Sequence, residues 1–141
     1  MAKPSSPAKT VRAEVHWEGD SKEVLHGWPK DIRVDFGHAI NEMQEGRSAT
    51  LEVRPMPSVG KGVFELKTDD ETTWYRLMYI ARVDDVIYVL DCFEKDTRKT
   101  AQKDIARSQD RYKQVQKRLM EERKHAKHKQ RIEQAKPRHK G

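Results

Sequence analysis

The chain has 141 residues, of which 35% are apolar, so it can form one modest core with an appendage rather than two domains. No stretch approaches the run of about 18 apolar residues that a membrane span needs, and the N-terminus lacks the apolar segment of a secretory signal. The single cysteine, Cys92, excludes an intrachain disulfide and favours a reducing compartment. We therefore expect a soluble, cytoplasmic protein.

The charge is divided along the chain. Residues 1–99 contain 15 Lys and Arg against 18 Asp and Glu, whereas residues 100–141 contain 14 against 5. The resulting net charges, −3 and +9, place the whole positive excess in the last 42 residues. Such a block favours a polyanionic partner such as RNA, and a merely solubilising tail is the alternative.

The first elements are predicted from composition and alternation. Residues 1–10 are rich in Pro, Ser and Lys, and we predict that they are disordered. Residues 11–17 alternate apolar and polar side chains, which predicts a strand. Ser21 then offers an N-cap for a short helix that ends at Gly27.

A second helix is predicted from Trp28-Pro29, with proline in its first turn, to Gly46. Its apolar residues recur at helical spacing; they are Ile32, Phe36, Ala39, Ile40 and Met43. We expect two antiparallel helices joined by a tight turn.

Strands follow the helices. Three are predicted close together, at residues 63–67, 74–83 and 86–93, and residues 50–53 can form a further short one. Short acidic turns join the three, so they must be antiparallel neighbours. This order of elements predicts an α+β fold with helices on one side of a mainly antiparallel sheet.

The last element is predicted to be a long helix with Thr100 as its N-cap. Spacings of three and four residues give it one face that can dock on the body, formed by Ile105, Ser108, Tyr112, Val115 and Leu119. Beyond Met120 this face fades, and the remainder is either an exposed helix or disordered. We therefore divide the chain into a disordered segment (1–10), a folded domain (11–120) and a basic tail (121–141).

Arg76 is the most unusual charged residue of the predicted strands. Strand alternation puts it on the same face as Trp74 and Met78, a face that an apolar core would normally occupy. A charge there is costly unless it is paired, and Glu65 on the adjoining strand is the nearest partner. The pair either braces the sheet or holds a guanidinium ready to bind a phosphate, and the two roles are compatible.

A basic stretch with Lys95, Arg98 and Lys99 precedes the last helix, where backbone amides also favour anions. Phe93 beside it can stack on a base or fill the core, and core packing is favoured. No nucleotide-binding glycine loop, paired-cysteine metal site or serine elbow is found. Cys92 is expected to be a buried inert thiol, and the pair His125 and His128 is a weak metal site at most.

A set of short motifs, in order and at characteristic spacing, resembles the phage-derived HigB-type toxins of the RelE/ParE superfamily. The resemblance runs from about Val15 to Tyr112. The motifs are Val15-His16-Trp17, Gly62-Val63-Phe64-Glu65-Leu66, Tyr75-Arg76 with Tyr79, Ile87-Tyr88-Val89-Leu90, Phe93-x-Lys95, Arg98-Lys99-Thr100, Asp104-Ile105 and Arg111-Tyr112.

The resemblance implies a RelE-like fold and a ribosome-dependent endoribonuclease that cleaves mRNA, with no metal and no cofactor. Its partners would be the ribosome, mRNA and a helix-turn-helix antitoxin encoded alongside. Arg76 would bind the scissile phosphate, Glu65 would orient Arg76 or act as base, and Lys95 with Arg98 would stabilise charge or move a proton. The implied RNA-binding residues are Phe93, Lys99, Lys61, Arg107 and Arg111.

The chain departs from the family pattern at three places, each less cationic than the relatives. Pro57-Ser58 stands where relatives often have Lys-Gly, with Lys61 as the candidate substitute. Asp91 replaces a family histidine, and Asp96 replaces the second lysine after the Phe-x-Lys motif. Two other functions therefore stay open: a ParE-like gyrase inhibitor without enzymatic activity, and a degenerate protein that only binds nucleic acid or its antitoxin.

Overall fold

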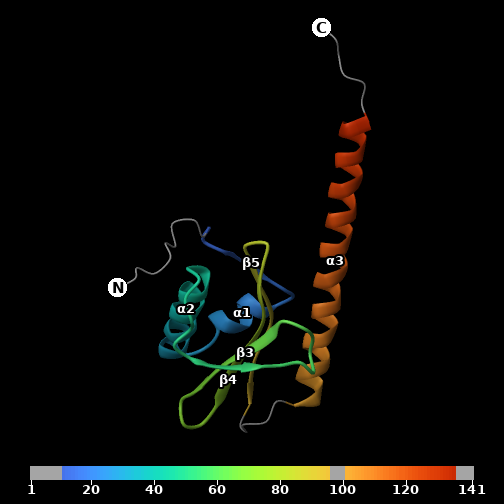
Figure 1. The fold of residues 1–141 in the computed structure, drawn as a ribbon. Helices are drawn as coiled ribbons and strands as arrows, with labels where there is room; N and C mark the ends of the chain where they lie inside the picture. The colour runs from blue at the N-terminus through green and yellow to red at the C-terminus, as the bar shows by residue number, and fades with distance from the viewer. Residues whose placement is uncertain (1–10, 96–100, 136–141) are drawn as a thin grey trace, which may run out of the picture.

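The computed structural model describes residues 11–95 and 101–135. Its elements, in chain order, are β1 (Glu14–Trp17), α1 (Ser21–His26), α2 (Lys30–Gln44), β2 (Glu52–Pro55), β3 (Val63–Asp69), β4 (Trp74–Val83), β5 (Val86–Lys95) and α3 (Gln102–Ala135). This order of strand, two helices, strand meander and long helix confirms the predicted α+β class (Figure 1).

The five strands form one mixed sheet in the order β1-β5-β4-β3-β2. The antiparallel meander β3-β4-β5 is as predicted, whereas β1 adds parallel to β5 at one edge. Asp84 and Asp85 both have positive φ, 49° and 64°, in the turn between β4 and β5. Left-handed conformations at both central residues match the right-handed twist of the strands, and so allow the two-residue turn.

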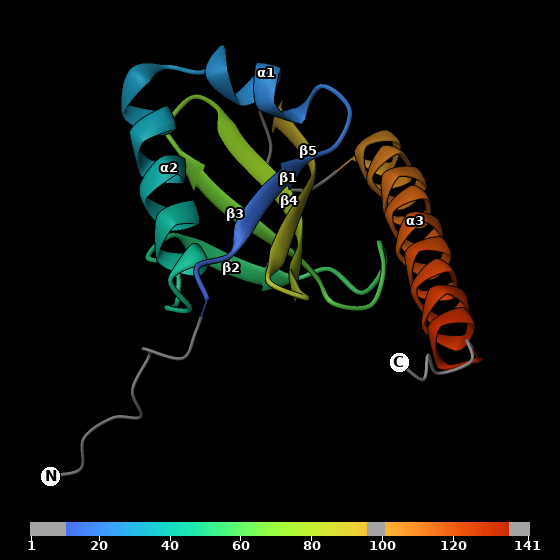
Figure 2. The ribbon, with the colours of Figure 1, turned by 90° about the horizontal axis from the view of Figure 1, so that it is seen from above.

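Helices cover both faces of the sheet, which corrects the prediction that they lie on one side. Figure 2 shows α1 and α2 on one side and α3 on the other. Tyr75, Leu77 and Tyr79 of β4 point into the core under α1 and α2, and Met78 and Ile80 point into the core under α3. The central strand is thus buried on both faces, and this requires two covering layers.

The first two helices differ from their predicted arrangement. Asp20, not Ser21, is the N-cap of α1, and Ser21 is a buried residue of its first turn. Pro29 is the N-cap of α2, one residue earlier than the predicted first turn. The two helices do not pack side by side as an antiparallel pair, because α1 lies mainly on β5 while α2 lies on β3 (Figure 2).

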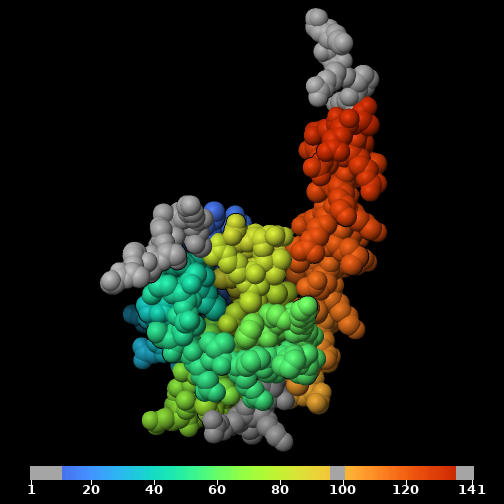
Figure 3. All heavy atoms as spheres, viewed as in Figure 1, coloured from blue at the N-terminus to red at the C-terminus, as the bar shows by residue number. Residues whose placement is uncertain are grey.

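α3 has a docked half and a projecting half. Its side chains Ser108, Val115 and Leu119 are buried against the sheet, as predicted. From Glu121 to Ala135 every side chain is exposed, and the helix extends beyond the body (Figures 1 and 3). Of the two alternatives for the segment beyond Met120, the structure shows an exposed helix as far as Ala135. The expected N-cap Thr100 and the segment 1–10 lie outside the described residues.

None of the helices in the described ranges combines the length and apolar character needed to cross a bilayer.

Candidate functional site

A β-bulge in β5 turns Asp91 towards α3. Met78 pairs with Asp91 and Tyr79 pairs with Val89, so Leu90 is an extra residue in β5. An extra residue breaks the alternation of the strand, and both Leu90 and Asp91 consequently face α3. The bulge thus places a carboxylate that is 1% exposed directly beneath the docked half of α3.

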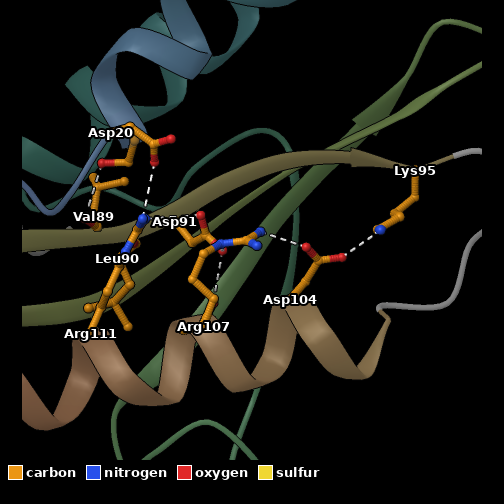
Figure 4. A network of polar contacts seen from close by, with 10 residues as sticks. Asp20, Val89, Leu90, Asp91, Lys95, Asp104, Arg107 and Arg111 are labelled. Atoms are coloured by element: carbon orange, nitrogen blue, oxygen red, sulfur yellow. Dashed lines mark hydrogen bonds and ion pairs between the residues drawn. The ribbon is translucent and has the colours of Figure 1, made fainter.

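Asp91 is the centre of an ion-pair network between β5 and α3 (Figure 4). Arg107 Nε donates to Asp91 Oδ2 at 2.8 Å, and Arg111 Nη1 donates to Asp91 Oδ1 at 3.1 Å. Arg107 also donates to Asp104 at 2.6 Å, and Lys95 Nζ lies 2.8 Å from the other oxygen of Asp104. The predicted site residues Lys95, Arg107 and Arg111 therefore lie along one seam, each with a carboxylate partner.

The same network fixes the turn after β1 to α3. Arg111 donates to Asp20 at 3.1 Å and to the carbonyl oxygen of Leu90 at 2.9 Å. Arg118 donates two hydrogen bonds to Glu18, at 3.0 and 2.8 Å. The contacts to Asp20 and Glu18 join residues 91 and 100 positions apart, and they tie the docked half of α3 to the first turn of the chain.

Burial and neighbouring charges shift the pKa values of Asp91 and Arg107 in opposite directions. Burial raises the pKa of Asp91, although the guanidinium groups of Arg107 and Arg111 oppose the shift. Burial alone would lower the pKa of Arg107, but Asp91 and Asp104 together raise it. Arg107 thus remains a fixed positive charge at the seam.

A second charged pair lies within the sheet. Arg76 Nη1 is 3.2 and 3.3 Å from the two carboxylate oxygens of Glu65, and both side chains are 0% exposed. Arg76 shares its face with Trp74 and Met78, as predicted, and its guanidinium carbon is 6.0 Å from the centre of the Trp74 ring. The predicted ion pair between Arg76 and Glu65 is therefore confirmed, and a phosphate can reach Arg76 only if its surroundings open.

Strand register collects the polar side chains at one end of the face that α3 covers. Arg76 is opposite Phe93 and Lys67, and Trp74 is opposite Lys95. We call this group the polar end. It consists of four charged residues and the two aromatic residues between them: Glu65, Lys67, Arg76, Lys95, Trp74 and Phe93. It holds three cations and one carboxylate on adjacent strands.

The other residues predicted for the site lie in different surroundings. Phe93 is 6% exposed within the core, with the guanidinium carbon of Arg107 6.0 Å from its ring centre, so the core interpretation of Phe93 is confirmed. Lys61 is exposed in the loop before β3, apart from the polar end, and its carbonyl oxygen accepts a hydrogen bond from Tyr112. Arg98 and Lys99 lie outside the described residues.

A family model for "Phage derived protein Gp49-like (DUF891)" matches residues 23–113. The chain belongs to the Gp49-like family. This family is one of HigB/RelE-like toxins. A search of curated proteins found none that matches the chain. The Gp49-like match covers α2, the whole meander and the start of α3, and it ends before the projecting half of α3.

Sequence reasoning missed several charged residues of this Gp49-like chain. Lys67 is 4% exposed, lies 3.4 Å from Glu52 and has its Nζ 5.3 Å from the centre of the Trp74 ring. Its position two residues after Glu65 was the available signal, because alternation puts both on one face. Asp104 belongs to one of the family motifs, but neither its pairing with Lys95 nor that of Glu18 with Arg118 has a local signal, because the partners come from different elements.

Metal binding and a cysteine nucleophile are the other chemistries to compare with the described part of the chain. There, no group of three or more His, Cys, Asp and Glu side chains is arranged to hold a metal ion, and His125 and His128 are exposed on α3. Burial raises the pKa of the Cys92 thiol well above its usual value. The expected burial of Cys92 is therefore confirmed, and a buried thiol with a raised pKa is a poor nucleophile.

Proposed function

We propose that this Gp49-like protein is the toxin of a toxin–antitoxin pair and that it cleaves mRNA on the ribosome. The proposal combines membership of a toxin family with the chemistry of the polar end. Its partners would be mRNA, the ribosome and a helix-turn-helix antitoxin encoded alongside.

The observation that carries the proposal is the fully buried pair of Arg76 and Glu65. The cost of taking both charges out of water roughly cancels their attraction, so apolar residues of similar volume would serve folding as well. A buried ion pair flanked by Lys67 and Lys95 is an expensive way to fill a sheet face. It is a suitable way to neutralise a phosphate, whose charge grows as it is attacked.

In the proposed reaction the ribose 2′-hydroxyl attacks the adjacent phosphorus and the 5′-oxygen leaves. The products are a 2′,3′-cyclic phosphate and a new 5′-hydroxyl end. Arg76 binds the non-bridging oxygens bidentately, and Glu65 accepts the hydroxyl proton. Lys95 protonates the leaving oxygen, while Arg98 stabilises the developing negative charge. The reaction needs a local opening, because Arg76 exposes no surface in this structure.

The test is induction of the protein in growing cells, with labelling of translation and of DNA synthesis. New 5′ ends should appear in a reporter mRNA, and they should disappear when its start codon is removed. Equal cutting of untranslated message would contradict ribosome dependence. Arrest of DNA synthesis before translation would favour a gyrase inhibitor, and growth without arrest would favour a protein that only binds.

A further inference from the structure

Two sets of cations on α3 have different surroundings, and Lys103, Arg123 and Lys129 belong to neither set. Those on its inner side, Arg107, Arg111 and Arg118, each contact at least one carboxylate at 3.1 Å or less. Those on its outer side are exposed, and among the described residues none lies within ion-pairing distance of a carboxylate. We call them the outer stripe: Lys113, Lys117, Lys124, Lys127 and Arg131.

The outer stripe faces away from the body. At about 100° per residue, Lys113, Lys117, Lys124 and Arg131 lie within an arc of about 40° around the helix. The buried residues Ser108, Val115 and Leu119 fall on roughly the opposite side. At 1.5 Å per residue the stripe is about 27 Å long, and it runs from Lys113 on the docked half of α3 to Arg131 on the projecting half.

The carboxylates of the projecting half do not neutralise the stripe. Glu122 and Glu133 lie towards the docked side, and Glu121 lies beside the stripe. In the range 121–135 the structure has one ion pair, between Arg123 and Asp84 at 3.9 Å, and it is not within the helix. A helix that is polar all round needs packing, internal ion pairs or a partner, and this segment lacks the first two.

We infer that the outer stripe binds the phosphate backbone of helical RNA. The choice of RNA over DNA rests on the proposed function, in which the protein acts on the ribosome. Lysine is a compact, hydrated charge that suits backbone contact without base recognition. The stripe would therefore anchor and orient the toxin, while the polar end, which lies on the inner side of α3, acts on the message.

The anchor is not the same as the basic tail predicted from sequence. Lys113 and Lys117 lie on the docked half, before residue 121, and belong to the stripe. Arg118 and its charge belong to the inner set, because Glu18 neutralises it. Removing the tail would thus remove only part of the binding surface.

The experiment measures binding of the full chain to a fluorescent RNA duplex of mixed sequence at several salt concentrations. One variant carries K113Q, K117Q, K124Q and R131Q. A matched control carries K22Q, K30Q, R33Q and R54Q, which removes the same charge from exposed positions on the body. Circular dichroism checks that both variants keep their helix, which glutamine favours.

In a plot of log affinity against log salt concentration, the slope of the stripe variant should be smaller in magnitude by about 3 to 4. This is close to one unit of slope for each lost phosphate contact. The control should keep the wild-type slope. The inference would be overturned if the slope fell equally in both variants, or in neither. It would also be overturned if the wild-type protein bound duplex DNA more tightly than duplex RNA. Because this test needs no cleavage, failure of the proposed ribonuclease would leave its outcome unchanged.

Discussion

Arg76 Nη1 lies 3.2 Å from Glu65 Oε1, and neither side chain exposes any surface. The two residues occupy adjacent strands on the face that α3 covers, beside Trp74 and Lys67. Folding and the proposed chemistry therefore depend on the same pair, and experiments on it must separate stability from activity.

Removal of one partner should destabilise the protein. Glu65→Ala leaves the Arg76 guanidinium without its carboxylate in the interior, and we expect the free energy of unfolding to fall by about 3–5 kcal/mol. The double variant Glu65→Leu with Arg76→Met should lose much less, because neither charge of the pair stays buried without the other. Urea denaturation measures both, with Glu94→Ala at an exposed position of β5 as control. A Glu65→Ala protein as stable as this control would contradict the account of the pair.

Asp91 should hold the docked half of α3. Asp91→Ala removes the shared acceptor of Arg107 and Arg111, and we expect a loss of about 1–3 kcal/mol. Hydrogen exchange should show faster opening of α3 amides between residues 102 and 120. Asp110→Ala is the matched control, since Asp110 is exposed and its side-chain partner within the described ranges is its helix neighbour Gln114. Unchanged exchange in Asp91→Ala would mean that Asp91 is not needed to hold the docked half of α3.

Because of Tyr79, the free energy of unfolding should decrease as the pH rises in the alkaline range. Burial raises the pKa of Tyr79 to about 12. The folded protein therefore holds the phenol proton more tightly than the unfolded chain does. The resulting contribution to the free energy of unfolding is fully present below about pH 10. It is lost as the pH rises from about 10 to 12. Denaturation at increasing pH should show a smaller alkaline loss for Tyr79→Phe than for wild type, and identical profiles would contradict the assignment.

Deletion of residues 123–141 should leave thermal stability almost unchanged, because every described side chain beyond Met120 is exposed. Affinity for ribosomes should fall and its salt dependence should become shallower, since fewer counterions are released. Part of the salt dependence should survive through Lys113 and Lys117. Calorimetric melting and ribosome sedimentation measure these effects; a large drop in melting temperature would show that the helix docks beyond Met120.

The sequence predicts the strands well, because alternation and acidic turns are local signals. It also predicts the pair of Arg76 and Glu65, whose positions on adjoining strands follow from alternation. Apolar residues at both parities of β4, such as Leu77 and Met78, were a signal for two covering layers, and the expectation of helices on one side overlooked it. The role of Asp91 is not local: it requires the bulge at Leu90 and the docking position of α3.

The most direct test of the central claim is the initial rate of mRNA cleavage by the purified protein on translating ribosomes. Loss of a bidentate contact to the phosphate costs about 2–4 kcal/mol, so Arg76→Ala should cut roughly 10² to 10³ times more slowly. Arg76→Lys should be nearly as slow, because a point charge does not replace the planar guanidinium. Urea denaturation must show that each variant is folded under the assay conditions. A folded Arg76→Ala protein that cleaves at the wild-type rate would contradict the claim.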